Sequence, residues 1–431
     1  MTTAGGSSPL LARLTELFTN DPLIDEIGLL FDVALKDLTP DTAFVYEDHK
    51  LGVAFCAGVP LFQEARTRFH ELNPSLAAGD DDALCAELEH CTRAILLISA
   101  DFYSGWNTRK ALVARGWLDA NDEIRFTNLV FTVNPKSIDT WAYRRWLAIR
   151  ICGEMTVPNE RAAFFHEQIE VCALLAEQKP RNYHAWSFRH WVVSQFTTHE
   201  ELYEELERMH KWCESHIIDH SGWNHRQHTL NQLLRQYPAR MRSQRQSLVL
   251  AEHAMVSTIM ARYPTHEALW CHRRCVVQLM LREASGQLSS EDNDVSKHEL
   301  CSHIQDFEAQ VRSGARLSSV DADGAHDGVV HEYLHESWGA IRADLDDSDE
   351  AVRRHWSSTA VALACIREVE VAWACDSRHA RRYAVWCLER LKQWTHNAVL
   401  RAAATSLSSS CRRELMTKDV LLENLWSSSA A

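Results

Sequence analysis

Along most of the 431 residues, apolar positions recur every three or four residues, with polar positions between them. This spacing is typical of helices that each bury one side. One segment shows it well, because Phe164, Phe165, Ile169, Cys172 and Leu175 fall on one side of a single helix. The pattern predicts an all-α protein in which helix follows helix, with no β-sheet.

The N-terminal part is less regular. Residues 1–9 form a Gly- and Ser-rich tail that we expect to be disordered. Residues 21–35 place apolar residues at helical spacing, and we expect a helix there. Residues 36–60 mix short apolar runs with Asp, Pro and Gly and are expected to be loop, followed by a helix over residues 60–72.

Beyond a main array expected over residues 10–283, the composition changes. Residues 284–330 are rich in Ser, Asp, Gly and Glu, which predicts an acidic, solvated insertion. One helix is expected inside it, near residues 295–311. Residues 331–431 are expected to form C-terminal helices that include a degenerate last repeat without its Trp.

A Trp-x-x-Arg motif recurs five times between these ends, and its Trp residues are separated by 35, 45, 37 and 47 residues. The five copies are Trp106/Arg109, Trp141/Arg144, Trp186/Arg189, Trp223/Arg226 and Trp270/Arg273. A recurrence at this distance indicates stacked helical hairpins, each too small to bury its own apolar side. The sequence therefore predicts a right-handed α-α superhelix, that is, a solenoid of helical hairpins.

The turn before each motif helix is marked by proline. Pro135, Pro180 and Pro264 each stand six residues before a motif Trp, where they break the preceding helix. We expect the indole to be buried against that helix. Because Trp and Arg at i and i+3 share a helix face, the Arg is expected to stack on the indole or to bond nearby carbonyls. A purely structural role is the simplest interpretation of these ten residues.

Composition narrows the possible functions. A net charge of −14 argues against broad nucleic-acid binding, which needs a basic surface. Thirteen Cys scattered through helical patterns fit a reducing compartment, and no signal peptide or membrane-spanning run is visible, so a cytoplasmic location is expected. Cys271 and Cys275 have a spacing possible for zinc, but no second pair lies at a familiar distance, so no metal site is predicted.

Two stretches carry a resemblance to a known family. The segment Asn134 to Trp146, followed by Arg181 to Trp186, resembles the repeat signature of protein prenyltransferase α subunits. The resemblance covers residues 80–280 well. It implies that the chain is the α-like subunit of a heterodimer, wrapped around a β subunit that holds the catalytic zinc, and that the chain binds no cofactor itself.

The resemblance also implies a site in the turns before the motif helices. Lys136, five residues before Trp141, matches the position that reaches the isoprenoid diphosphate. Tyr183 and His184, three and two residues before Trp186, match positions that line the same site. These three are the expected catalytic residues. Their neighbours Arg181 and Asn182 are expected to contact substrate.

This chain departs from the pattern in two places. Ile138 stands where a Tyr is expected, and Arg181 stands where a Lys is expected. The expected activity is transfer of an isoprenoid, most plausibly geranylgeranyl, to protein cysteines, with the isoprenoid diphosphate and the protein substrate meeting at the shared site. The alternative is a non-catalytic helical-repeat scaffold that binds protein partners.

Overall fold

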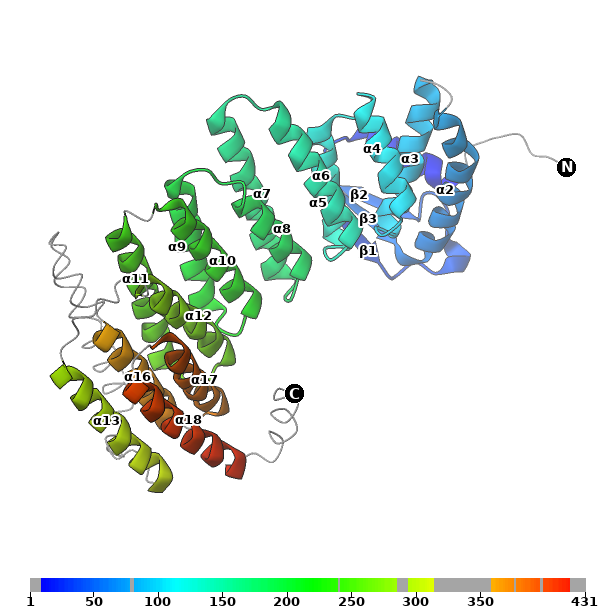
Figure 1. Cartoon of the computed structure of the whole chain (residues 1–431). Coiled ribbons are helices and arrows are strands. Elements are labelled where there is room, and N and C mark those ends of the chain that lie inside the picture. Colours follow the sequence, from blue (N-terminus) through cyan, green and yellow to red (C-terminus); the bar gives the residue numbers. More distant parts are fainter. Residues whose placement is uncertain are drawn as a thin grey trace. The chain divides into compact units, whose positions relative to one another are not determined.

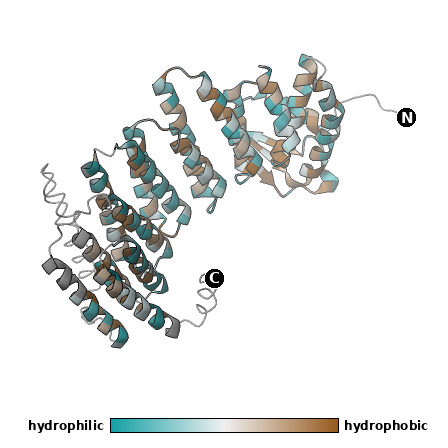
Figure 2. Cartoon of the chain, viewed as in Figure 1, coloured by the Kyte–Doolittle hydropathy of each residue, from teal (hydrophilic) through white to brown (hydrophobic). Residues whose placement is uncertain are grey.

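The computed structural model describes residues 9–77, 81–238, 241–284, 294–313, 358–375, 377–395 and 398–418 (Figure 1). Two units are distinguished by their internal contacts, Met1–Phe196 and Thr197–Ala431. In both units the described residues are mostly helical and the helices are paired, which confirms the predicted fold class. Hydrophobic and hydrophilic residues alternate around most of these helices, as Figure 2 shows.

The first unit opens with a small α/β element. It consists of α1 (Pro9–Asn20), β1 (Glu26–Leu30), β2 (Phe44–Glu47), β3 (Lys50–Ala54) and α2 (Gly58–Leu72). The strand order is β1-β3-β2, with β1 parallel and β2 antiparallel to the central β3. Short 3-10 turns, Leu35–Asp37, Phe55–Ala57 and Asn73–Ala77, connect these elements.

The sheet corrects three predictions, the first of which is that the chain contains no β-sheet. The helix expected over residues 21–35 is wrong, since β1 lies there, and residues 36–60 contain β2 and β3 rather than loop alone. Leu23 and Phe31, two of the apolar residues in that segment, are largely exposed. Strands this short are held by pairing with distant residues, which spacing within one segment does not reveal.

Three helical hairpins follow in the first unit: α3 (Asp82–Ile98) with α4 (Tyr103–Ala114), α5 (Ala120–Val133) with α6 (Ile138–Glu154), and α7 (Pro158–Gln178) with α8 (Tyr183–Val193). Side chains of Asp81, Asp119, Ser137 and Asn182 cap four of the helices by accepting backbone N–H groups. These caps fix where each helix begins.

The second unit repeats the plan with α9 (His199–Ser215) and α10 (His220–Gln236), α11 (Arg242–Arg262) and α12 (Glu267–Ala284), and α16 (Ser358–Ala374) and α17 (Arg378–Trp394). Two further helices, α13 (Asp294–Ser313) and α18 (Ala398–Lys418), pack against each other. In α17 of the last hairpin, Tyr383 is fully buried, whereas Trp386 is only partly buried.

Helix α13 confirms the helix expected near residues 295–311, but it is not part of a solvated insertion. Ile304, Phe307 and Val311 are buried. Glu308 accepts hydrogen bonds from Ser406 and Ser410 of α18, each at 2.8 Å. The Ser- and Asp-rich stretches on either side of α13, and the tail before Pro9, lie outside the described residues.

All five motif Trp residues are buried, as predicted. Several of them also bind the turn before their helix, because the indole Nε1–H donates to the carbonyl oxygen six residues earlier. The acceptors are Ala100 for Trp106, Pro135 for Trp141, Ile217 for Trp223 and Pro264 for Trp270, at 2.7–3.0 Å. Each of these Trp residues therefore fixes its own turn against its helix, and this positions the candidate site.

Candidate functional site

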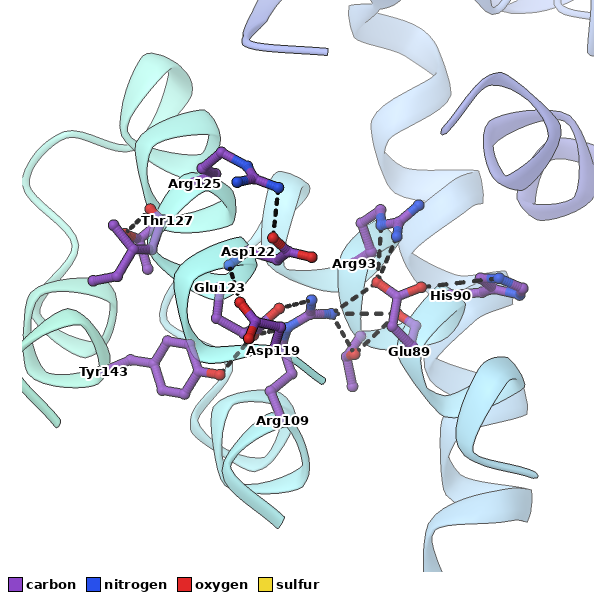
Figure 3. Close-up of polar contacts among 12 residues, drawn as sticks. Glu89, His90, Arg93, Arg109, Asp119, Asp122, Glu123, Arg125, Thr127 and Tyr143 are labelled. Atoms are coloured by element: carbon purple, nitrogen blue, oxygen red, sulfur yellow. Dashed lines mark hydrogen bonds and ion pairs between the residues drawn. The ribbon is translucent and has the colours of Figure 1, made fainter. Parts of the chain in front are cut away.

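Motif Arg residues join neighbouring hairpins. Arg109 of α4 donates through Nε and a terminal nitrogen to both carboxylate oxygens of Glu123 in α5, at 2.8 and 2.6 Å (Figure 3). Its other terminal nitrogen donates to Thr92 Oγ1 and to the Glu89 carbonyl in α3. The guanidinium thus holds its own hairpin and the next one together, which goes beyond the predicted stacking or carbonyl bonding.

The same joint recurs in the second unit. Arg226 of α10 binds Glu252 of α11 at 2.8 and 2.6 Å, and Arg273 of α12 binds Glu368 of α16 with two contacts of 2.6 Å. Both pairs are almost fully buried. Bidentate pairing of this kind is the strongest form of a charged hydrogen bond.

Arg189 of α8, the motif arginine nearest the candidate turns in sequence, lies in the core. Its guanidinium carbon lies over the ring of Trp186, 5.6 Å from the ring centroid, and only 3% of the residue is exposed. This is the predicted stacking of the Arg on its own motif indole, at a distance where a cation and an aromatic face attract each other. Arg189 therefore does not line the exposed turn surface, and the structure gives it a packing role.

Each of the three joint carboxylates accepts a further hydrogen bond from the second helix of its own hairpin. The pairs are Tyr143 with Glu123, His272 with Glu252 and Tyr383 with Glu368, all at 2.6 Å. Burial by itself would raise the pKa of Glu252, but the Arg226 charge and the His272 hydrogen bond lower this pKa to about 2. The carboxylate is therefore ionised at neutral pH although it is buried.

The joint at Arg144 lacks the carboxylate. Arg144 of α6 donates through Nε to the neutral amide oxygen of Gln168 in α7 at 2.9 Å. It also donates to neutral groups of α5, namely Thr127 Oγ1, Asn128 Oδ1 and the Ile124 carbonyl. Burial consequently lowers the pKa of Arg144 to about 10. Phe188 stands twenty residues after Gln168, where Glu123 and Glu252 have Tyr143 and His272.

The joint glutamates Glu123, Glu252 and Glu368 were not among the residues predicted from the sequence. A signal was present, because Glu123, Glu205 and Glu252 each precede a Tyr or His by twenty residues. His225 lies 2.7 Å from Glu205, so this third pair is in contact as well. The constant distance reflects one hairpin geometry repeated three times.

The candidate site lies in the first unit, where two neighbouring turns bind each other. Lys136, in the turn between α5 and α6, donates through Nζ to the Pro180 carbonyl in the turn between α7 and α8, at 3.1 Å. In the opposite direction, Asn182 donates through Nδ2 to the Pro135 carbonyl at 2.8 Å. The expected adjacency of these turns is thus observed, and Lys136 is exposed to solvent beside them.

Tyr183 and His184 begin α8 at this level. The Tyr183 side chain is 71% exposed, and its ring meets the His184 ring edge-on with centroids 5.6 Å apart. Arg181 has a left-handed backbone with φ of 62°, which turns the chain into α8 and is an unfavourable conformation for a residue with a Cβ. The turn therefore presents an ammonium and a phenol to solvent, with the half-buried imidazole of His184 beside them.

Asn182 differs from the expectation of a substrate contact. It is completely buried, its Oδ1 caps α8 by accepting the Ala185 N–H, and its Nδ2 is occupied by Pro135. The geometry makes it a positioning residue for the two turns. The ten motif Trp and Arg residues likewise lie in the core rather than on the exposed turn surface.

Acidic side chains lie on the other side of the α6 turn. Ser137 donates to Asp101 Oδ1 at 2.7 Å, and Asp139 is close enough to Asp101 that burial and then this neighbouring charge raise the pKa of Asp139. Within the described ranges, His, Cys, Asp and Glu side chains form no group of three or more suited to a metal ion. Among the helices described, none is both long and apolar enough to cross a bilayer.

Known proteins share this arrangement of repeats. The family model described as protein prenyltransferase alpha subunit repeat matches residues 120–150, 165–196 and 202–233. These matches correspond to most of α5–α6, to much of α7 with α8, and to α9–α10, so they include the turns that carry Lys136 and Tyr183. The matched unit is the same hairpin that the Trp, Arg and Glu contacts define.

Two groups of relatives differ in how much of the chain they cover. The human protein prenyltransferase alpha subunit repeat-containing protein 1 is 28% identical over 426 residues, which covers 86% of this chain and 94% of that protein. The Xenopus laevis protein 1-B is 27% identical over 427 residues, with coverage of 87% and 95%.

The human geranylgeranyl transferase type-2 subunit alpha is a more distant relative. It is 26% identical over 250 residues, covering 56% of this chain and 41% of that protein. Its shorter match leaves much of each chain without a counterpart in the other, whereas the first group matches almost from end to end. The chain thus carries three matched prenyltransferase alpha subunit repeats and is similar to the repeat-containing proteins over most of its length.

Proposed function

We propose that the chain is the α-like subunit of a heterodimeric protein prenyltransferase, acting with a β subunit that carries the catalytic zinc. The observation that supports this most is the mutual binding of the two turns through Lys136 and Asn182. Those contacts hold Lys136, Tyr183 and His184 at one level of the first unit. The relatives named for geranylgeranyl transfer favour geranylgeranyl as the lipid.

The exposed groups suit an isoprenoid diphosphate. When the carbon–oxygen bond to the lipid breaks, negative charge grows on the leaving diphosphate. A positioned ammonium and hydrogen-bond donors stabilise that charge more in the transition state than in the ground state. Lys136 uses one of its three N–H groups on Pro180, which leaves two for the anion. Tyr183 and His184 would supply further donors.

A β subunit needs a surface to contact, and the second helices of the first unit offer one. Lys110 of α4 lies over the half-buried Trp146 of α6 at 5.9 Å, and Arg145 of α6 lies over the half-buried Trp191 of α8 at 5.2 Å. Aromatic and Arg side chains of this kind are enriched where proteins bind each other. We place the partner on this side of α4, α6 and α8.

A non-catalytic scaffold is the second candidate. It is favoured by the same Lys136 contact, since a lysine that only ties two turns together would also donate to Pro180. The two functions differ in what the remaining N–H groups do. In a scaffold the remaining N–H groups of Lys136 contact water, and the exposed Tyr183 and half-buried His184 share no ligand with them.

Substituting Lys136 separates these functions. In a reconstituted heterodimer, Lys136→Ala should lower lipid transfer by about 10- to 1000-fold, on the order of 1.4 to 4 kcal/mol of transition-state stabilisation. Complex formation should be retained, because the interface rests on many residues. Lys179→Ala, at another exposed lysine just before the α8 turn, is the matched control and should leave transfer unchanged.

Both quantities are to be measured on the same protein preparations. Normal transfer by Lys136→Ala would remove this residue from the site and favour a subunit that only positions the protein substrate. Failure of the wild-type chain to form a stable complex with any prenyltransferase β subunit would favour the scaffold.

A further inference from the structure

An exposed aromatic pair lies in the α/β element before the repeats. Phe31 directly follows β1, and Phe55 directly follows β3. Because these strands are parallel and pair Leu30 with Ala54, the two Phe residues leave the sheet side by side. Their rings stack with centroids 5.1 Å apart, yet the side chains remain 73% and 61% exposed. The two rings therefore contact each other, and no other part of the described structure buries them.

Two more large apolar side chains are exposed in the segments that follow Phe31 and Phe55 in the sequence. Val59, one helical turn after Phe55, is 66% exposed, and Leu35 is 65% exposed. Since Phe44 of β2 pairs with Val53 of β3, the connection from residue 31 to residue 43 begins and ends at the edge where Phe31 and Phe55 leave the sheet. We refer to Phe31, Leu35, Phe55 and Val59 as the Phe31 surface.

Four exposed apolar side chains in the two segments that follow one edge of the sheet are unusual for a surface that meets only water. Single exposed apolar residues are common, but clusters mark sites where another molecule binds. The repeats explain none of these residues, because the matched repeats begin at residue 120. The Phe31 surface therefore needs its own explanation.

The charges beside the surface select the occupant. The connection that carries Leu35 also carries exposed Asp32, Asp37 and Asp41 against one exposed cation, Lys36. A second copy of the chain would bring a second set of these carboxylates face to face with the first. An anionic membrane would meet the same repulsion. Only a cationic ligand gains both from the apolar contact and from the charge.

We propose that the Phe31 surface docks a segment of a partner protein that carries bulky apolar side chains flanked by Lys or Arg. The apolar side chains cover Phe31 and Phe55, and the flanking cations lie against Asp32, Asp37 and Asp41. This contact goes beyond the prenyltransferase function, because it uses no residue of the turns that carry Lys136 and Tyr183. It gives the chain a means of selecting a partner through a part that precedes the repeats.

A peptide-display selection tests this with a defined probe. A library of peptides about 12 residues long, enough to span a site of this kind, is selected on the full-length chain, with Phe31→Ser/Phe55→Ser as the counter-selecting protein. Enriched peptides should contain two or more bulky apolar residues flanked by Lys or Arg. A labelled synthetic peptide of the enriched sequence should then bind in fluorescence anisotropy, with an affinity that falls as salt is added.

The variants give the quantitative outcome. Phe31→Ser should weaken peptide binding by about tenfold or more, as expected for a central aromatic contact. Asp32→Asn/Asp37→Asn should weaken it less and reduce its dependence on salt. Leu23→Ser is the matched control, since Leu23 is similarly exposed before β1 begins and should leave binding unchanged. Circular dichroism of each variant confirms that the fold is retained.

Several outcomes would overturn the proposal. These are enrichment that does not depend on Phe31 and Phe55, enrichment of acidic peptides, or no enrichment. A dimer in sedimentation that Phe31→Ser dissociates would assign the surface to a second copy. Binding of the wild-type chain to phosphatidylserine vesicles, lost in Phe31→Ser, would assign it to a membrane. None of these measurements involves lipid transfer, so they leave the proposed enzymatic function to be tested separately through Lys136→Ala.

Discussion

Replacing Glu252 by Gln tests whether the carboxylates that join the hairpins stabilise the second unit. The substitution keeps the shape of the side chain and removes its charge. Arg226 then faces an amide whose single oxygen replaces two, and whose NH2 group would oppose a guanidinium N–H. Removing one partner of a buried ion pair leaves the other charge uncompensated, which costs about 3 to 5 kcal/mol.

The pKa of Glu252 gives a second estimate. Its usual value of 4.5 is lowered to about 2, a difference that corresponds to about 3 kcal/mol of stability at neutral pH. Because the pKa is lower in the folded state, this contribution is present above pH 4.5 and is lost as the pH falls toward 2. At pH 4 the wild-type chain should already have lost part of it, on the order of 1 kcal/mol.

Urea unfolding at pH 7 and at pH 4, followed by Trp fluorescence, checks both numbers. Glu252→Gln should be less stable than wild type by about 3 kcal/mol at pH 7, and this difference should narrow at pH 4, by on the order of 1 kcal/mol. Glu214→Gln, at an exposed glutamate of α9, is the control and should change stability by less than about 0.5 kcal/mol. An equal gap at both pH values would mean that the loss is steric and that the charge argument is wrong.

Three further substitutions test the first unit. Trp186→Ala should lower the free energy of unfolding by about 3 to 5 kcal/mol, and an unchanged melting temperature would contradict its place in the core. Arg181→Gly should raise stability by up to about 1 kcal/mol in urea unfolding, because glycine tolerates the left-handed φ; a fall in lipid transfer by the same variant would support a substrate contact. Gln168→Glu should raise stability by about 1 kcal/mol by giving Arg144 a counter-charge, and a lower urea midpoint would show that burying the carboxylate costs more than the pair returns.

The repeats were predictable because their signals are local. A Trp, an Arg three residues later and a Pro six residues earlier lie within one turn and one helix, so a single segment contains the whole pattern. The stacking of Arg189 on Trp186 is of this local kind, since both side chains belong to one face of α8. The adjacency of Lys136 and Tyr183 followed from stacking equal hairpins. What these turn residues do chemically stays a prediction, since residue type and position do not by themselves identify a ligand.

Other features depend on contacts between distant residues and were not predictable. Arg109 and Arg226 find their glutamates 14 and 26 residues further along, whereas Arg273 binds Glu368 across 95 residues. No fixed spacing from the Arg identifies such partners, although the twenty-residue spacing from Glu to Tyr or His marks Glu123 and Glu252. The N-terminal strands could not be predicted for the same reason. Strand β1 is stabilised by β3, which lies beyond β2 in the sequence. Short strands carry little information of their own.

The joint at Arg144 shows which contacts of the motif Arg persist when the carboxylate is absent. Two positions differ there at once, since Gln168 replaces the glutamate and Phe188 replaces the Tyr or His that would bind it. The Arg is nevertheless kept, completely buried, and still donates to the Thr127 hydroxyl and the Ile124 carbonyl of its own hairpin. Charge pairing is thus absent at this joint, whereas the guanidinium bonds the preceding helix at Arg109, Arg144, Arg226 and Arg273 alike. This explains why the Trp and the Arg form the recurring motif. The carboxylate contacts only one side of the joint and is not part of that motif.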